Sequence, residues 1–113
     1  MEMSIQKFIE DNNIAIFVKA DLNTNEFEIT QGKTGIESRD LFEQLILGGN
    51  AEDLRNSVKD QIMPRIWAQG NTKCFLCKSD EDTLIALFLD TELETKDLYY
   101  YAKQLDSSLK QIL

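Results

Sequence analysis

The chain has 113 residues, 42% of them hydrophobic, and its 20 acidic and 12 basic side chains give a formal net charge of −8. This length suits one hydrophobic core, so we expect a single domain over residues 1–113. Nucleic acids and anionic membranes are bound through lysine and arginine, so the acidic balance argues against both kinds of partner. A basic protein partner remains compatible with it.

The first residues lack the basic start and apolar stretch of a signal peptide, and no run is long enough to span a bilayer. Nothing in the cysteine usage indicates an oxidising compartment. We therefore expect a cytoplasmic protein.

The first half of the chain predicts a helix, a hairpin and two more helices. Residues 4–11 have amphipathic spacing, residues 14–18 form an apolar run typical of a central strand, and residues 26–30 alternate polar and apolar. Ser38 precedes one expected helix, and Asn50 is the expected cap of the next. The apolar stripe of that second helix is Leu54, Val58, Ile62 and Ile66, with Pro64 predicting a kink or an early end near Met63.

The second half predicts a hairpin followed by a long helix. Residues 73–78 form one strand, and the unbroken apolar run at 83–90 predicts a strand covered on both faces. Thr91 and Glu94 then fit a capping box. The helix after them has the apolar stripe Leu98, Tyr101, Ala102, Leu105, Leu109 and Ile112.

This order of elements predicts an α+β fold with an antiparallel sheet of four to five strands packed with helices. The two apolar strands, 14–18 and 83–90, are expected side by side at the centre. Strand 26–30 then lies outside the first of them, and strand 73–78 lies outside the second, at the edge of the sheet.

No catalytic constellation is present, because the chain has no histidine and therefore lacks the usual general base and the commonest metal ligand. Cys74 and Cys77 point to opposite faces of a strand, too far apart for a disulfide, and zinc would need two more ligands. Residues 32–34 (Gly-Lys-Thr) resemble the end of a phosphate-binding loop, but Phe27 stands where its first glycine is required. We expect no enzyme activity, no cofactor and no metal.

Aromatic residues and the expected edge strand give the best functional lead. Aromatic rings are enriched at protein–protein interfaces, and an apolar edge strand can pair with a second chain. Tyr99 and Tyr100 stand partly outside the stripe of the last helix, and Trp67 stands off its own expected helix stripe. We therefore expect an interface formed by Trp67, Phe75, Cys77, Tyr99 and Tyr100, the alternative being that these residues complete the edges of the core.

Residues 84–90, with residues 101–105 and the Leu109/Leu113 ending, resemble the C-terminal strand and helix of roadblock-type proteins. These are relatives of the dynein light chain roadblock and bacterial partners of small Ras-like GTPases. The resemblance implies a profilin-like α+β sandwich that homodimerises through an edge strand and the central helix. It also implies a non-catalytic scaffold or regulator of a small GTPase or a motor complex. The chain has one expected strand fewer than the family, and Gly48, Gly49 and Pro64 interrupt its central helix.

Two other functions are compatible with the same residues. A small acidic inhibitor or immunity-type protein would block a basic enzyme, and would gather its carboxylates on one face. A PAS-like small-molecule sensor would need a pocket between sheet and helices. Evenly spread acids with an apolar dimer face would instead favour the scaffold.

Overall fold

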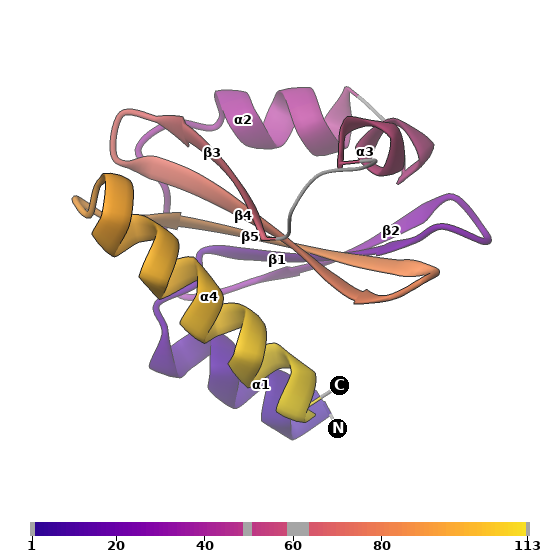
Figure 1. The fold of residues 1–113 in the computed structure, drawn as a ribbon, viewed down its shortest axis with the longest axis horizontal. Coiled ribbons are helices and arrows are strands. Elements are labelled where there is room, and N and C mark those ends of the chain that lie inside the picture. Colours follow the sequence, from indigo (N-terminus) through magenta and orange to yellow (C-terminus); the bar gives the residue numbers. More distant parts are fainter. Residues whose placement is uncertain (1, 49–50, 59–63, 113) are drawn as a thin grey trace.

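The computed structural model describes residues 2–48, 51–58 and 64–112 (Figure 1). Its helices and strands follow in the order α1 (Glu2–Asp11), β1 (Ile16–Asp21), β2 (Glu26–Gln31), α2 (Asp40–Phe42), η1 (Glu43–Leu47), α3 (Ala51–Val58), β3 (Arg65–Gln69), β4 (Thr72–Asp80), β5 (Thr83–Asp90) and α4 (Thr95–Ile112). The short helix α2 continues directly into η1, a π-helical turn. Within the described residues, no helix is both long and apolar enough to cross a membrane.

Five antiparallel strands form one sheet in the order β2-β1-β5-β4-β3. The two apolar strands β1 and β5 pair side by side, with β2 outside β1, as the sequence predicts. The expected α+β class with a four- to five-stranded antiparallel sheet is confirmed.

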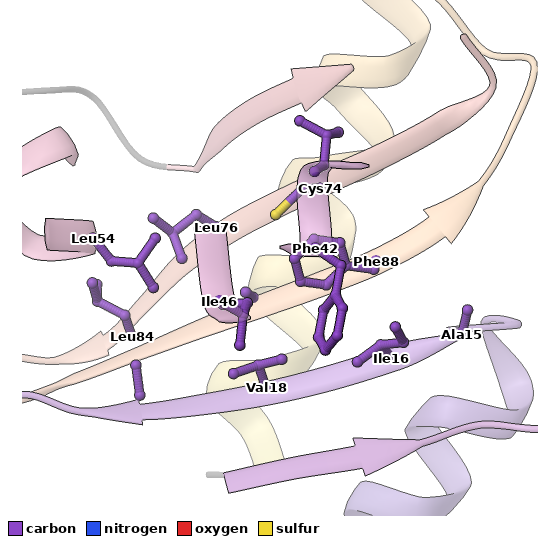
Figure 2. Close-up of a cluster of buried hydrophobic side chains, with 13 residues drawn as sticks. Ala15, Ile16, Val18, Phe42, Ile46, Leu54, Cys74, Leu76, Leu84 and Phe88 are labelled. Atoms are coloured by element: carbon purple, nitrogen blue, oxygen red, sulfur yellow. The ribbon is translucent and has the colours of Figure 1, made fainter. Parts of the chain in front are cut away.

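Helices cover both faces of the sheet, as Figure 1 shows, with α1 and α4 on one side and α2 and α3 on the other. Two hydrophobic clusters follow from this arrangement. Phe42, Ile46 and Leu54 pack with Val18 and other strand residues on the α2 side (Figure 2). The α4 side buries the apolar faces of α1 and α4. The sheet is therefore the middle layer of a sandwich.

Strand β5 shows why an unbroken apolar run marks a central strand. Leu84, Ala86 and Phe88 belong to the cluster on the α2 side. The residues between them, Ile85 and Leu87, belong to the cluster on the α4 side. Because successive side chains point to opposite faces, a strand covered on both faces must be apolar at every position.

The main difference from the expected fold lies after α3. The predicted helix from Asn50 with a stripe to Ile66 is wrong at its end, because the chain forms strand β3 from Arg65 onward. Asn50 and the segment 59–63 lie outside the described residues. Pro64 lacks a backbone donor and disfavours helix before it, and Ile66 and Trp67 suit a strand. Gly70, with φ +62°, then turns the chain into β4.

This added strand changes two expectations. The strand that carries the cysteines, β4, is not at the edge of the sheet, because β3 pairs along it from Arg65 to Gln69. Strand β3 is also the fifth strand of the sheet, whereas the sequence had predicted one strand fewer than in roadblock-type proteins.

The start of α4 differs as well. The expected capping box at Thr91 and Glu94 is wrong, since α4 starts at Thr95. Thr91 Oγ1 instead accepts a hydrogen bond from the Leu93 N–H at 3.2 Å, which closes a local turn before the helix.

Candidate interaction surfaces

Two of the five predicted interface residues lie inside the protein. Phe75 and Cys77 are 0% and 1% exposed and belong to the core cluster on the α4 side. The Phe75 ring packs edge to face on the Tyr101 ring of α4, with centroids 5.8 Å apart. The prediction placed them at a surface because it placed β4 at the sheet edge. Because β3 pairs along the outer side of β4 and α4 packs on its face, neither side chain reaches solvent.

Trp67 does lie at the edge of the sheet, on β3 rather than on a helix. It pairs with Cys74 of β4, and its partly buried ring packs against the cluster on the α2 side. The Arg65 guanidinium lies 5.5 Å from the centroid of the Trp67 ring. Such a contact stabilises by about 0.5–1 kcal/mol at exposed sites. The edge strand thus presents an aromatic ring with a cation on it.

The free edge of β3 is bordered by α2. Gln69 at the end of β3 donates from Nε2 to Asp40 Oδ2 of α2 at 3.0 Å. Ile66 faces the opposite side of the sheet, where it pairs with Phe75 and packs against the cluster there. The strand carries no carboxylate in its five residues. This surface, β3 with the neighbouring α2, is called the β3 edge below.

The other free edge, β2, has a different composition. Glu26 and Glu28 are exposed, and Ile29, the residue after Glu28, is 41% exposed. Glu28 stands opposite Lys19 of β1, whereas Glu26 stands opposite Asp21. Charged side chains on an edge strand hinder pairing with another sheet. This surface is called the β2 edge below.

Tyr99 and Tyr100 lie on the outer side of α4 and are 39% and 55% exposed. The Lys103 ammonium lies 5.4 Å from the Tyr99 ring centroid, and that of Lys96 lies 5.8 Å from the Tyr100 ring centroid. Helix α4 covers the face of the sheet opposite to the one on which Trp67 packs. The five predicted residues therefore form two separate surfaces and part of the core.

One polar cluster was missed by the sequence analysis. Asp90, at the end of β5, accepts hydrogen bonds from the Thr72 hydroxyl (2.6 Å) and the Glu37 N–H (2.8 Å). Thr72 is fully buried, and its Oγ1 accepts from the Ser38 N–H at 3.0 Å. These bonds fasten the segment before α2 to the ends of β4 and β5. An aspartate at the end of a buried strand was the only signal for it in the sequence.

The remaining sequence motifs have structural roles. The Gly32 N–H donates to the Ala15 carbonyl at 2.8 Å, and a Cβ at Gly32 would come 2.0 Å from the Ile14 carbonyl oxygen. A glycine is therefore required there by close backbone approach.

Burial raises the pKa of the Cys74 and Cys77 thiols, with the adjacent charge and hydrogen bond of Asp106 adding to this at Cys77. Neutral buried thiols are poor nucleophiles.

In the part of the chain that the structure describes, neither the recess beside α1 nor the placement of the carboxylates specifically favours a ligand-binding or an acidic blocking role. An open recess of about 150 Å³ beside α1 is smaller than the ~300–1,000 Å³ of usual ligand pockets. Among the described residues, no cluster of three metal-ligating side chains occurs. Exposed carboxylates occur over both helical layers and the sheet edge, on residues Glu10, Asp11, Glu26, Glu28, Glu43, Glu52, Asp53, Glu81, Asp82, Glu92 and Glu94. They are spread rather than gathered on one face.

No protein-family model and no curated protein matches the chain, whereas solved structures do. Myxococcus xanthus MglB is 12% identical, with a TM-score of 0.57 over 97% of this chain and 91% of its own. The gliding protein MglB from Thermus thermophilus is 11% identical, with a TM-score of 0.60 over 97% of this chain and 85% of its own. At these identities the likeness concerns the arrangement of helices and strands.

Proposed function

We propose that this chain, which has a roadblock-type fold, is a non-catalytic interaction module that homodimerises through its β3 edge and regulates a small Ras-like GTPase. The observation that carries the dimer is the contrast between the two free edges of the sheet. The β3 edge has Ile66 and Trp67 and no carboxylate in the strand, whereas the β2 edge has Glu26 and Glu28. Strand β3 therefore has no carboxylates that would repel those of a second copy, and its one charged residue, Arg65, does not stand opposite itself in a pair centred on Trp67.

Self-pairing of β3 is chemically consistent along the strand. In an antiparallel pair with a two-fold axis at Trp67, Arg65 of one copy stands opposite Gln69 of the other, and Ile66 stands opposite Ala68. No like charges then face each other, and apolar side chains meet. A pair of β2 strands would instead bring four carboxylates to one seam, and like charges directly opposite are destabilising.

The β3 strand alone is too small for a stable dimer, because specific interfaces bury about 1,200–2,000 Å² in total. The adjoining helix supplies the remaining contact area. Helix α2 packs beside β3 through the Gln69–Asp40 hydrogen bond, and the Asp90 cluster holds its start in place. Leu47, at the end of η1, is 61% exposed and adds an apolar side chain on the same face of the sheet. The dimer face thus combines the edge strand with the central helix, as the roadblock resemblance implies.

The GTPase partner rests on the family resemblance. Roadblock-type proteins include bacterial partners of small Ras-like GTPases, and the two solved structures reported above are bacterial MglB proteins. This favours a GTPase over a motor complex. The spread of the carboxylates gives no specific support to an inhibitor, and the recess beside α1 gives none to a sensor.

Light scattering across micromolar concentrations tests the dimer, with Ala68→Glu as the disrupting variant. Ala68 is exposed on β3, so its replacement leaves the core intact, and in the proposed pair it would place two carboxylates beside Ile66. We expect a wild-type dimer and at least about tenfold weaker association for the variant. Gln31→Glu on the β2 edge adds the same charge and should leave the dimer unchanged. A wild-type monomer at every concentration would contradict the proposal.

The GTPase is tested with small Ras-like GTPases from the same genome, each loaded with GDP or a non-hydrolysable GTP analogue. We expect one of them to bind the wild-type dimer in one nucleotide state and to bind the Ala68→Glu variant more weakly. If none binds in either state, or if hydrolysis and exchange rates are unaffected by the protein, the regulatory proposal fails while the dimer stands.

A further inference from the structure

The outer side of α4 carries a basic and aromatic surface on an otherwise acidic protein. Helix α4 has three lysines and two aspartates, a net charge of +1, so the remaining nine basic and 18 acidic side chains of the chain sum to −9. Lys96, Lys103 and Lys110 are seven residues apart, which places them along one line of the helix. With the exposed rings of Tyr99 and Tyr100 beside them, they form what we call the α4 ridge.

Among the described residues, only one of the three cations of the α4 ridge has an ion-pair partner. Lys110 forms an ion pair with Asp106 at 3.3 Å. Lys96 and Lys103 instead lie near the Tyr100 and Tyr99 rings, and no described residue forms an ion pair with either. These contacts hold the two ammonium groups close to exposed aromatic surface. A carboxylate that reached them would add an ion pair without breaking one.

Helix contacts show which way the α4 ridge faces. The Tyr101 hydroxyl donates to the Asn12 carbonyl after α1 at 3.4 Å, so that flank of α4 faces α1. Asp106 lies on the opposite flank, beside the Cys77 thiol of β4. At 100° per residue, Tyr99 and Lys103 share the flank of Asp106. The ridge therefore lies away from α1, on the layer of the sandwich opposite α2.

We propose that the α4 ridge binds a short acidic segment of a partner protein, with its carboxylates on the lysines and its apolar side chains on the tyrosine rings. From Lys96 to Lys110 the helix rises about 21 Å. An extended segment of about six residues spans that length. Cation–carboxylate pairs and aromatic contact area are both common in protein interfaces.

Charge complementarity favours a short protein segment over larger polyanions. A nucleic acid or an anionic membrane would extend past the α4 ridge and meet the rest of the chain, which carries a charge of −9. A short segment stays within about one Debye length, ~8–10 Å, of the lysines and avoids that repulsion. The proposal does not require pairing of β3, because the ridge lies on the other layer.

Fluorescence anisotropy with a labelled poly-L-glutamate peptide tests the proposal on the full chain. We expect salt-sensitive binding to wild type, and about tenfold weaker binding to the double variant Lys96→Gln/Lys103→Gln. The matched control is Lys19→Gln/Lys78→Gln, which removes two exposed lysines elsewhere and so has the same net charge as the ridge variant. It should bind within about twofold of wild type. Tyr99→Phe should keep binding, whereas Tyr99→Ala should weaken it, because the ring rather than the hydroxyl contacts the Lys103 ammonium and can contact the methylene groups of the glutamate side chains.

Three results would overturn the proposal: no binding of the peptide to wild type at low salt, equal weakening in both double variants, or ridge-dependent binding of phosphatidylserine vesicles without binding of the peptide. Circular dichroism and light scattering on the ridge variant separate this test from the proposed dimer. We expect both to match wild type, so that lost peptide binding reports on the α4 ridge alone.

Discussion

The β2 and β3 edges occupy equivalent places at the two ends of one sheet, yet their side chains differ in kind. On β2, Glu26 and Glu28 are exposed, and Glu26 already stands opposite another carboxylate, Asp21. On β3, Trp67 is partly buried under the Arg65 guanidinium, and no strand residue is acidic. An unpaired edge is a template for pairing with another chain, and charge is a common protection. One edge is therefore protected by its charged side chains, whereas the strand at the other edge carries no carboxylate, which is why we propose it for pairing.

Strand β4 completes the comparison, because it is the strand that the sequence suggested as an edge. Its residues from Thr72 to Cys77 are buried, and it pairs on both sides, with β3 and with β5. The contrast teaches that lysines flanking an apolar strand do not mark an edge. Lys73, one of those lysines, is itself buried and donates from Nζ to the Gly70 carbonyl.

The largest expected effect on stability comes from replacing a phenylalanine by alanine in the interior strand β4, and the same substitution in the edge strand β2 provides the comparison. Phe75→Ala on β4 should lower the free energy of unfolding by about 3–5 kcal/mol, because a fully buried ring leaves a cavity. Phe27→Ala on β2 should cost about 1–2 kcal/mol, because that ring is partly exposed. Urea unfolding followed by circular dichroism measures both. Equal costs would show that β4 is not interior.

The next effect concerns the glycine that follows β2. Gly32→Ala should lower the free energy of unfolding by about 2 kcal/mol or more, because the added Cβ would lie 2.0 Å from the Ile14 carbonyl oxygen and the backbone must move. Gly35→Ala, three residues on, meets nothing within 4 Å and should change it by less than about 0.5 kcal/mol. Thermal and urea unfolding of the two variants provide the comparison, and a harmless Gly32→Ala would refute the close approach.

The buried thiols of β4 should make stability fall at alkaline pH. Burial raises the pKa of Cys74 and Cys77 above the ordinary value of 9.0. Unfolded thiols lose their protons above that pH while folded thiols keep them, so the stabilisation is complete below pH 9 and is lost as the pH rises. The expected slope approaches about 1.4 kcal/mol per pH unit for each thiol. Urea unfolding between pH 7 and 10.5 should show a shallower decline in Cys74→Ala than in wild type.

The smallest effect on stability should come from removing the charges of the β2 edge. Glu26→Gln/Glu28→Gln should change the free energy of unfolding by less than about 0.5 kcal/mol, because both carboxylates are exposed. It should nevertheless allow assemblies larger than a dimer at high concentration, since both edges can then pair. The control Glu81→Gln/Glu92→Gln makes the same charge change away from the edges. Sedimentation velocity distinguishes them, and identical behaviour of the two variants would show that charge does not protect β2.

Periodicity and apolar runs predicted most of the fold. The run at 83–90 and the stripe from Leu98 to Leu109 identified β5 and α4, because burial on both faces or on one helix face leaves a direct trace in the sequence. Strand β3 was missed because Leu54, Val58, Ile62 and Ile66 happen to follow helical spacing. Strand β3, with five residues, is too short to show its own alternation, and the extended bias around Pro64 was interpreted as a kink or an early end of a helix.

The positions of the proposed interface residues were only partly predictable for the same reason. Because β3 was interpreted as helix, Phe75 and Cys77 were placed at a sheet edge that they do not occupy. Trp67 does lie at the edge of the sheet, but it does so because it belongs to β3, a strand that was not predicted. The Asp90 cluster could not be predicted, because Glu37, Thr72 and Asp90 are brought together only by the fold.

Amide hydrogen exchange measured by NMR on the two edge strands tests the central claim most directly. In an edge strand, alternate N–H groups point away from the sheet and exchange fast unless a partner strand covers them. We expect the outward amides of β3 to become protected as the protein concentration rises, while those of β2 stay unprotected. Fast exchange along β3 at every concentration, or protection that develops on β2 instead, would contradict the assignment of β3 as the dimer edge.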